Sequence, residues 1–247
     1  MPAMMISKQL VWDALSRFVK PSLLAQTAAE LPSGIAVPPQ WVAILQAQQA
    51  SGRMEASAGW DDFSAQLPTM AAFFHKQARP LLLLADADHA VSLLYPFTAG
   101  GELYLYRGHP PLSAVPERFQ SVWPRIPQQF RDFYTAVHNG WAFLSANSMG
   151  PLPVEDWACL SDDRFDIDDG SAAGMPADPG KVIAVFHNGG GDYLCLDFSA
   201  PDGVATGLIW WHDDPGHPDV VNFWAALDAW IGVFFEDVDN VQARAAV

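Results

Sequence analysis

Apolar residues recur every three or four positions in several segments near the start of the chain, which is typical of amphipathic helices. Pro21 ends the first of these segments, and Pro68 interrupts the last, because a proline ring cannot continue a helix. The proline that opens the third segment is harmless there, since the first helical amide has no partner to lose. The expected helices are residues 6–19, 22–31, 38–49 and 59–77.

After Pro80 the pattern changes to short apolar runs between turn residues, which predicts antiparallel strands. A helix is expected from Ile126-Pro127 to Asn139-Gly140, and another near the end of the chain. The predicted fold class is therefore α+β, an antiparallel sheet flanked by helices. The expected strands lie within residues 80–97 and in residues 102–106, 182–187, 193–198 and 206–211, and the closing helix covers residues 220–235.

Domain organisation is read from length and composition. A chain of 247 residues can form one large domain or two small ones. Residues 159–180 have no apolar period and are rich in Asp, Gly, Ser, Ala and Pro, so we expect a long surface loop. We expect an α+β domain in residues 121–247. Residues 1–120 form a helical region with short strands, which is either a separate domain or part of the same one.

The acidic residues are concentrated late in the chain. Residues 1–150 contain 10 Lys/Arg and 10 Asp/Glu, whereas residues 151–247 contain 3 and 18, so the formal net charge of −15 belongs to the second segment. Such a surface repels phosphate and anionic membranes, which argues against nucleic acid or a membrane as the partner. The densest acidic run is either a solvated loop or a patch that attracts a basic protein. It consists of Asp162, Asp163, Asp166, Asp168 and Asp169.

The stretch that follows the last expected strand has the residue types of a metal site. His and Asp are common metal ligands, and five of them occur close together. The two histidines, however, are five positions apart across a Pro-Gly pair, which is not the i, i+4 spacing of a helical metal motif. We interpret the stretch as a strand end, a turn, and a carboxylate near the start of the closing helix. The residues are His212, Asp213, Asp214, His217 and Asp219.

Other reactive residue types also lack a catalytic pattern. A glycine-rich turn between two expected strands lacks the GK[ST] ending of a phosphate loop. Ser145, Ser148 and Ser199 do not stand in a nucleophile elbow. Cys159 and Cys195 have neither metal-binding spacing nor a catalytic signature. We therefore expect no enzyme activity, no bound metal and no cofactor.

Two adjacent tryptophans stand on the last expected strand. Because successive side chains of a strand point to opposite faces, Trp210 and Trp211 cannot both face the core of a sheet with one wet face. Tryptophan is enriched at the energetic centres of protein interfaces. The exposed member of this pair is therefore a candidate partner contact.

Several short motifs follow one another in the second half of the chain. They are Ile126-Pro127, Asn139-Gly140, Gly191-Asp192-Tyr193-Leu194 with Leu196-Asp197, and Gly203-Val204 before Trp211-His212-Asp213. Their order, over roughly residues 120–237, resembles the SUKH superfamily, also called the Smi/Knr-type domain. In that family a proline-led helix ends in Asn-Gly, Gly-Asp opens a central strand that ends in Asp, and the next strand ends near His-Asp.

The resemblance implies a function in bacterial competition. Many bacterial members are immunity proteins, which neutralise a cognate toxin delivered to neighbouring cells, often a nuclease or deaminase, and the family is not known for a catalytic centre. Nuclease toxins need basic surfaces to hold phosphate, so an acidic protein can occupy such a surface. We therefore expect an inhibitor of a basic, nuclease-type toxin. The candidate contacts are Asp162, Asp163, Asp166, Asp168, Asp169, Trp210, Trp211, Asp213 and Asp214.

Two alternative functions remain open. A regulatory scaffold of the same superfamily would bind a host protein instead of a toxin. A metal-dependent hydrolase would use His212, Asp213 and His217, and would bind a divalent ion with a defined stoichiometry.

The beginning of the sequence bears on location. Charged residues interrupt the apolar positions of the first twenty residues, so they do not form the apolar core of a signal peptide. We therefore expect the protein in the cytoplasm.

Overall fold

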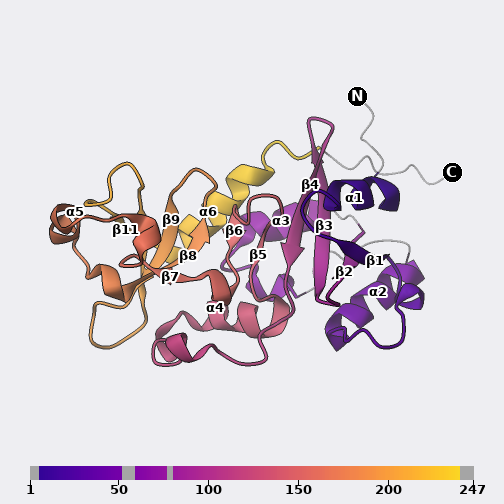
Figure 1. Ribbon diagram of the computed structural model, residues 1–247, viewed down its shortest axis with the longest axis horizontal. Helices are drawn as coiled ribbons and strands as arrows, with labels where there is room; N and C mark the ends of the chain where they lie inside the picture. Colours follow the sequence, from indigo (N-terminus) through magenta and orange to yellow (C-terminus); the bar gives the residue numbers. More distant parts are fainter. Residues whose placement is uncertain (1–5, 52–58, 77–79, 240–247) are drawn as a thin grey trace.

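The computed structural model describes residues 6–51, 59–76 and 80–239, which form an α+β fold with two antiparallel sheets (Figure 1). The predicted fold class is thus confirmed. The first sheet has the order β1-β2-β3-β4-β5, with β1 Pro21–Ala25, β2 Leu82–Asp86, β3 Val91–Ala99, β4 Glu102–Gly108 and β5 Trp141–Phe143. The second has the order β11-β10-β9-β8-β6, and β7 also pairs with β8; its strands are β6 Gly150–Pro151, β7 Ala158–Cys159, β8 Val182–His187, β9 Tyr193–Asp197, β10 Thr206–Trp210 and β11 Asp219–Val221.

Helices lie around and between the sheets. The α-helices of the described residues are α1 Lys8–Leu15, α2 Pro39–Ser51, α3 Pro68–Lys76, α4 Gln128–Asp132, α5 Asp169–Gly174 and α6 Phe223–Phe235. The first sheet has a different cluster on each face, because successive strand residues point to opposite sides. Leu94 and Leu105 pack with Leu15 of α1, whereas Tyr95 and Tyr106 belong to the main core.

The expected helix over residues 22–31 is wrong. The segment forms β1, which pairs with β2 and places Leu24 opposite Leu84, and then a short 3-10 turn, Ala28–Glu30. The pairing buries Leu24 and Ala25. An apolar run this short fits a helix and a strand equally well, and contacts with a partner strand decide the outcome.

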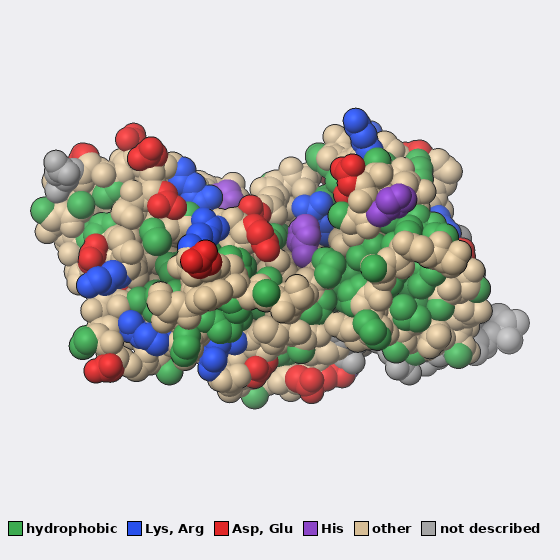
Figure 2. Space-filling view, turned by 60° about the horizontal axis from the view of Figure 1, so that its bottom comes forward, with side chains coloured by type: hydrophobic (Ala, Val, Ile, Leu, Met, Phe, Trp, Pro, Cys, Tyr) green, Lys and Arg blue, Asp and Glu red, His purple; other side chains and the backbone are tan. Residues whose placement is uncertain are grey.

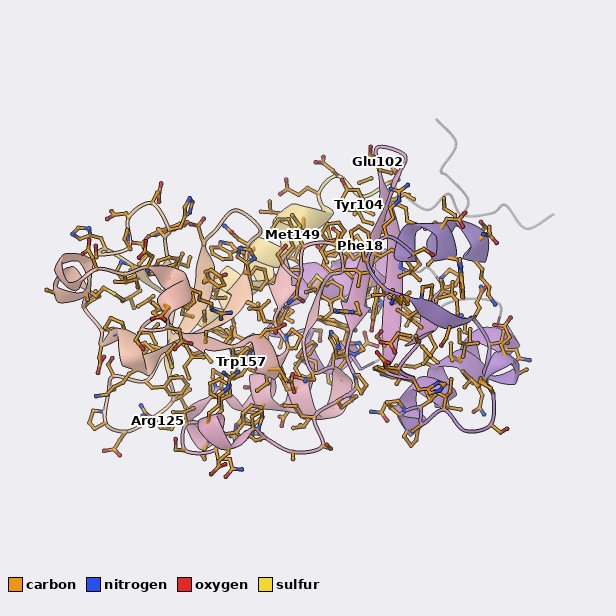
Figure 3. All side chains as sticks on the ribbon, in the orientation of Figure 1. Phe18, Glu102, Tyr104, Arg125, Met149 and Trp157 are labelled. Carbon is orange, nitrogen blue, oxygen red and sulfur yellow. The ribbon has the colours of Figure 1, made fainter. Side chains whose placement is uncertain are left out.

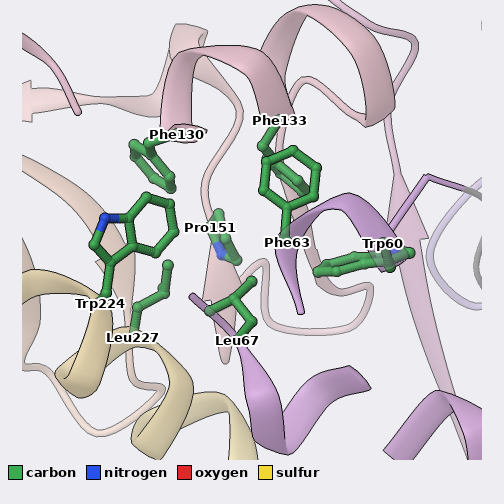
Figure 4. A pocket seen from close by; sticks show the side chains of 8 residues that line it. All are labelled: Trp60, Phe63, Leu67, Phe130, Phe133, Pro151, Trp224 and Leu227. Atoms are coloured by element: carbon green, nitrogen blue, oxygen red, sulfur yellow. The ribbon is translucent and has the colours of Figure 1, made fainter. Parts of the chain in front are cut away.

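The main hydrophobic core contains residues of both sheets and runs from Ala25 to Phe235. At its centre the ring of Trp60 lies 5.1 Å from that of Phe133 and 5.0 Å from that of Trp141. Figure 4 shows Trp60 and Phe133 among the side chains that line a narrow apolar crevice. The lining comes from distant parts of the chain: Trp60, Phe63 and Leu67 precede position 120, and Phe130, Phe133, Pro151, Trp224 and Leu227 follow it. Residues on both sides of the expected boundary at position 120 therefore share one core.

Helices α3 and α6 are joined by a buried carboxylate. Asp228 of α6 is 7% exposed, and its two oxygens each lie 3.1 Å from the backbone N of Thr69, at the start of α3. The backbone N of Met70 donates to the same carboxylate at 3.3 Å. A side chain on one helix thus satisfies amides that the first turn of the other leaves without partners. The two helices also approach closely, since a Cβ on Gly232 would lie 2.9 Å from Thr69 Cγ2.

A chain of buried polar groups runs through the core behind the first sheet. The Nε1–H of Trp60 donates to the Tyr95 hydroxyl at 3.3 Å, and that hydroxyl is 2.7 Å from Nε2 of His138. The other ring nitrogen, Nδ1, is 3.2 Å from the backbone oxygen of His109. A carbonyl only accepts, so Nδ1 carries the proton and the Tyr95 O–H donates to Nε2. Burial lowers the pKa of His138 to about 3, so this imidazole is neutral.

The helix expected between residues 126 and 140 is present but changes its geometry. It begins as α4 and continues as a π-helix over Phe133–Val137, with Phe133, Tyr134 and Val137 buried. The chain then turns at Gly140, whose φ is +79°. A Cβ there would lie 2.3 Å from the backbone N of Pro153, so only glycine fits.

The closing helix begins later than expected. Val220 and Val221 belong to β11, which pairs with β10, and Asn222 caps α6 by accepting from the Ala225 amide at 3.0 Å. α6 is strongly apolar because it lies against the second sheet, where Leu227 and Ile231 are buried. Within the described residues, no helix has both the length and the apolar character needed to span a bilayer.

Residues 159–180 are not the solvated loop that their composition predicts. They contain 3-10 turns at Asp163–Phe165 and Pro179–Lys181 as well as α5. Their apolar residues form a second cluster with Trp210 on the outer face of the second sheet. These residues are Leu160, Phe165, Met175 and Ala177. The segment is thus a packed layer, and both faces of the second sheet are covered.

Candidate protein-binding surface

The acidic run lies on the outer side of this layer. The buried ring of Phe165 fixes it to the sheet, at 5.3 Å from the ring of Trp210. Asp162, Asp163 and Asp166, which surround that anchor in the sequence, are exposed. Asp168 is exposed as well, and the side chain of Asp169 lies outside the described part of the structure.

Asp168 also has a structural role, which the sequence did not indicate. It is the N-cap of α5, and its Oδ1 accepts from the backbone N of Ser171 at 2.7 Å. This hydrogen bond lowers the pKa of the Asp168 carboxyl. The residue therefore combines an exposed charge with the start of a helix.

The turn after β10 is held together by side-chain hydrogen bonds. Asp219 accepts from the indole N–H of Trp211 at 2.9 Å, and His217 Nδ1 lies 2.7 Å from Asp214 Oδ1. The placement of Asp219 near the start of the closing helix was wrong, because this residue opens β11 and Asn222 is the helix cap. Asp213, Asp214 and Asp219 are exposed.

The structure brings the acidic run and this turn together. Gly216 of the turn lies against α5, because a Cβ on this glycine would be 3.4 Å from the backbone oxygen of Ser171. Figure 1 shows α5 and β11 at the same end of the molecule. We call this exposed surface the acidic end, and define it by Asp162, Asp163, Asp166, Asp168, Asp213, Asp214 and Asp219.

The Lys and Arg side chains described in residues 151–247 do not neutralise the carboxylates of the acidic end through ion pairs. Arg164 lies within the run, but its Nη2 donates to the backbone oxygen of Asp156 at 2.9 Å and its guanidinium lies over the Phe165 ring at 5.0 Å. Lys181 is 3.8 Å from Asp178. Neither cation forms an ion pair with a carboxylate of the acidic end in the described residues.

Three ligand atoms could in principle meet a metal ion. One atom each from Asp192, His212 and Asp213 lies within 4.8 Å of the others. His217, which the hydrolase alternative requires, instead pairs with Asp214. Asp192 Oδ1 already contacts both the backbone N of His212, at 3.1 Å, and its Nδ1, at 2.7 Å. An ion would have to displace the imidazole from this carboxylate.

The same contacts between Asp192 and His212 link two turns. Burial raises the pKa of the Asp192 carboxyl, but hydrogen bonds from His212 and Asn188 outweigh it, so the pKa is lowered overall. The hydrogen bond to Asp192 in turn raises the pKa of His212. This charge-assisted contact holds the turn before β9 against the turn after β10.

The two tryptophans of the expected pair differ in exposure. Trp210 is 4% exposed, because the layer over the outer sheet face covers it. Trp211 follows the end of β10, is half-buried, and lies 6.3 Å from the Trp230 ring of α6. Trp211 is thus the member of the pair that reaches the surface.

The candidate nucleophiles form no hydrogen bond with a basic side chain in the described part of the chain. None of Ser145, Ser148 and Ser199 forms a hydrogen bond to a histidine in the described residues, and Ser148 Oγ is buried without a partner. Burial raises the pKa of both Cys159 and Cys195, which makes these thiols less reactive at neutral pH.

Comparison with protein families gives one match. Residues 114–232 match the model of the SMI1 / KNR4 family (SUKH-1). We call these matched residues the SUKH-1 domain. This range begins just before the 3-10 turn Glu117–Phe119, includes the whole second sheet, and ends within α6. No curated protein and no solved structure matched the chain.

The residues on which the resemblance depended have structural roles in this SUKH-1 domain. Gly140 has the positive φ and close contact described above, and Gly191 also has a positive φ, +110°. A Cβ on Gly191 would lie 2.9 Å from the imidazole of His212. Asp192 and His212 link the turn before β9 to the turn after β10 through a hydrogen bond. These residues of the motif therefore act in turns of the fold.

Proposed function

We propose that this protein is an immunity-type protein that binds and neutralises a cognate, basic protein toxin through its acidic end. The SUKH family is known for immunity-type proteins, and membership suggests a protein toxin as the partner. The observation that supports the proposal is that two segments with exposed carboxylates, distant in sequence, pack against each other where α5 meets the turn after β10.

The physics of such a surface favours a basic partner. Carboxylates of one sign raise the local concentration of an oppositely charged protein and accelerate its association. A nuclease-type toxin has a basic surface because it must hold phosphate. The half-buried indole of Trp211, which Asp219 orients, supplies an aromatic contact beside the carboxylates.

The first experiment identifies the partner. The tagged protein is used to capture partners from its native host, mass spectrometry identifies them, and growth rescue tests whether a captured toxin is neutralised. A basic toxin that binds and no longer kills is the expected result. Capture of a host regulatory protein, with no protection against any toxin, would favour the regulatory scaffold.

A variant with fewer negative charges tests whether the acidic end directs binding. The triple variant Asp162→Asn, Asp163→Asn and Asp166→Asn removes three exposed charges of the acidic end and keeps the Asp168 cap. We expect association with the captured toxin to slow by about tenfold at low salt, with a weaker salt dependence.

The matched control removes three exposed charges from the other half of the chain. It combines Asp62→Asn, Asp88→Asn and Glu102→Gln. This control should associate at nearly the wild-type rate. Equal rates for the two triple variants would show that the acidic end does not direct binding.

A further inference from the structure

The surface is hollowed between the two ends of the molecule, and basic, imidazole and acidic side chains gather there (Figure 2). Arg107 lies in β4 and His109 directly after it, whereas Glu155 and Asp156 follow β6. Asp156 is close enough to Arg107, and both carboxylates are close enough to His109, for their charges to interact. We call these four residues the junction hollow. It joins the first sheet to the SUKH-1 domain and lies outside the acidic end.

Arg107 has an unusual environment within this hollow. Its register partners are Leu94 of β3 and Ala142 of β5, so its stem crosses an apolar sheet face and the residue is half-buried. Burial lowers its pKa, although Asp156 and Asp86 act in the opposite direction. Across the described part of the chain, no acceptor forms a hydrogen bond or ion pair with its guanidinium. Partial desolvation without an acceptor costs free energy.

The two carboxylates of the hollow, in contrast, have partners. Asp156 Oδ2 accepts from Asn147 Nδ2 at 2.7 Å, and Glu155 Oε2 accepts from Asn139 Nδ2 at 2.8 Å. Burial and then the nearby Arg107 lower the pKa of His109 to about 4, so its imidazole is neutral at pH 7. Among the charged groups of the hollow, the guanidinium is therefore the one without a hydrogen-bond partner in the described residues.

Arg125 shows how this protein treats a half-buried arginine that supports the fold (Figure 3). It donates to three backbone oxygens in the loop after β9, from Nε to Gly203 at 3.1 Å, from Nη1 to Phe198 at 3.3 Å and from Nη2 to Ala200 at 2.6 Å. Arg107 has none of these contacts, so its donors are available to another molecule.

The chemistry of the hollow indicates what that molecule provides. A planar guanidinium fork suits a carboxylate, with which it forms two parallel hydrogen bonds. Glu155 and Asp156 would repel a free anion. A carboxylate on a protein does not have to overcome this repulsion alone, because neighbouring basic side chains of the same protein can contact Glu155 and Asp156.

We propose that Arg107 is a contact residue for the protein partner, which places a carboxylate side chain against its guanidinium in the junction hollow. This proposal rests on the proposed function, because it takes the captured toxin as the partner. It adds a second contact area, of mixed charge, to the acidic end. Arginine is among the residues most enriched at the energetic centres of interfaces.

The test compares two arginines in the free protein and in the complex. Arg107→Met, Arg107→Lys and the control Arg125→Met are each measured for the Tm of the free chain and for the Kd of the captured toxin. We expect Arg107→Met to keep or raise the Tm and to weaken binding about tenfold or more. Arg107→Lys keeps the charge but loses the fork, so binding weakens with an unchanged Tm.

The control behaves in the opposite way. Arg125→Met leaves three carbonyls without a donor, so the Tm falls by several degrees while the folded protein binds with nearly the wild-type Kd. An unchanged Kd for Arg107→Met, or a Tm loss as large as that of Arg125→Met, overturns the proposal. If the wild-type protein binds no toxin, the proposed function fails, and the Arg107 proposal fails with it.

Discussion

The core behind the first sheet and the acidic end of the second sheet use polar residues in opposite ways. In the core, Trp60, Tyr95 and His138 satisfy one another in a buried chain that ends on a backbone oxygen. At the acidic end, carboxylates point into solvent on a thin layer that Phe165 anchors. The first arrangement stabilises the fold, because each buried group has a partner, while the second leaves charge available for recognition. Under the proposed function, the core stabilises the fold and the acidic end binds the partner. The following changes test this division.

Trp60→Ala should have the largest effect on stability. Trp60 is 3% exposed and lies outside residues 114–232, but it packs on Phe133 and Trp141 within the SUKH-1 domain. We propose that residues before and after position 114 unfold as one unit. The variant should then lose about 3–5 kcal/mol of unfolding free energy in a single urea transition. Two transitions, of which only one shifts, would show two independent domains.

Acidification should weaken the core side of the comparison next. The pKa of His138 is lowered to about 3 and that of His109 to about 4, both below the usual value of 6.5. The unfolded chain therefore takes up protons that the folded chain excludes. Stability is complete above about pH 6.5 and falls below it, by about 1.4 kcal/mol per pH unit for each histidine.

Urea denaturation between pH 7 and pH 5 measures this slope. His109→Gln should reduce it by up to about half, whatever its effect on stability at pH 7. Ile231→Val removes no titratable group, so it serves as the control and should keep the wild-type slope. Equal slopes for all three proteins would show that buried histidines do not cause the acid sensitivity.

Asp228→Ala should have a smaller effect. It removes the acceptor of the Thr69 and Met70 amides and should lower the unfolding free energy by about 1–2 kcal/mol. Asp202→Ala, at an exposed position, is the matched control and should change stability by less than about 0.5 kcal/mol. A loss equal to that of the control would contradict the role of Asp228 as a helix cap.

Charge removal at the acidic end should affect the fold least. The triple variant of Asp162, Asp163 and Asp166 should unfold within about 0.5 kcal/mol of the wild type, since these exposed carboxylates make no capping hydrogen bond to the turn that they surround. Chemical denaturation checks this directly. A large loss of stability would mean that these carboxylates support the layer, and it would blur the distinction between the two regions.

Much of the fold could be predicted from local patterns. The strands β2 to β4 and β8 to β10 have short apolar runs between turn residues. Pro68, which was expected to interrupt a helix over residues 59–77, stands at the start of α3. The layer over residues 159–180 was missed because Leu160, Phe165 and Met175 are too irregularly spaced to show a period. The helix over residues 22–31 was wrong because β1 depends on its pairing with β2.

The candidate surface could be predicted only in part. The acidic run was visible in the sequence, and so was the turn after β10, but their proximity depends on the packing of α5 against Gly216. Nothing in the sequence indicated the junction hollow. Arg107 lies in β4 of the first sheet and Asp156 lies in a turn after β6 of the second sheet, so the two come close only in the folded chain. The match to the SUKH-1 domain identifies the turns rather than either surface.

The layer that carries the acidic run has a hydrophobic cluster of its own, separate from the main core. Mutations that redesign this layer therefore leave the packing around Trp60 and Trp141 intact. Under the proposed function, such independence would let the contacts with a toxin change without loss of folding. The second cluster thus separates the packing of the layer that carries the acidic run from the packing of the main core.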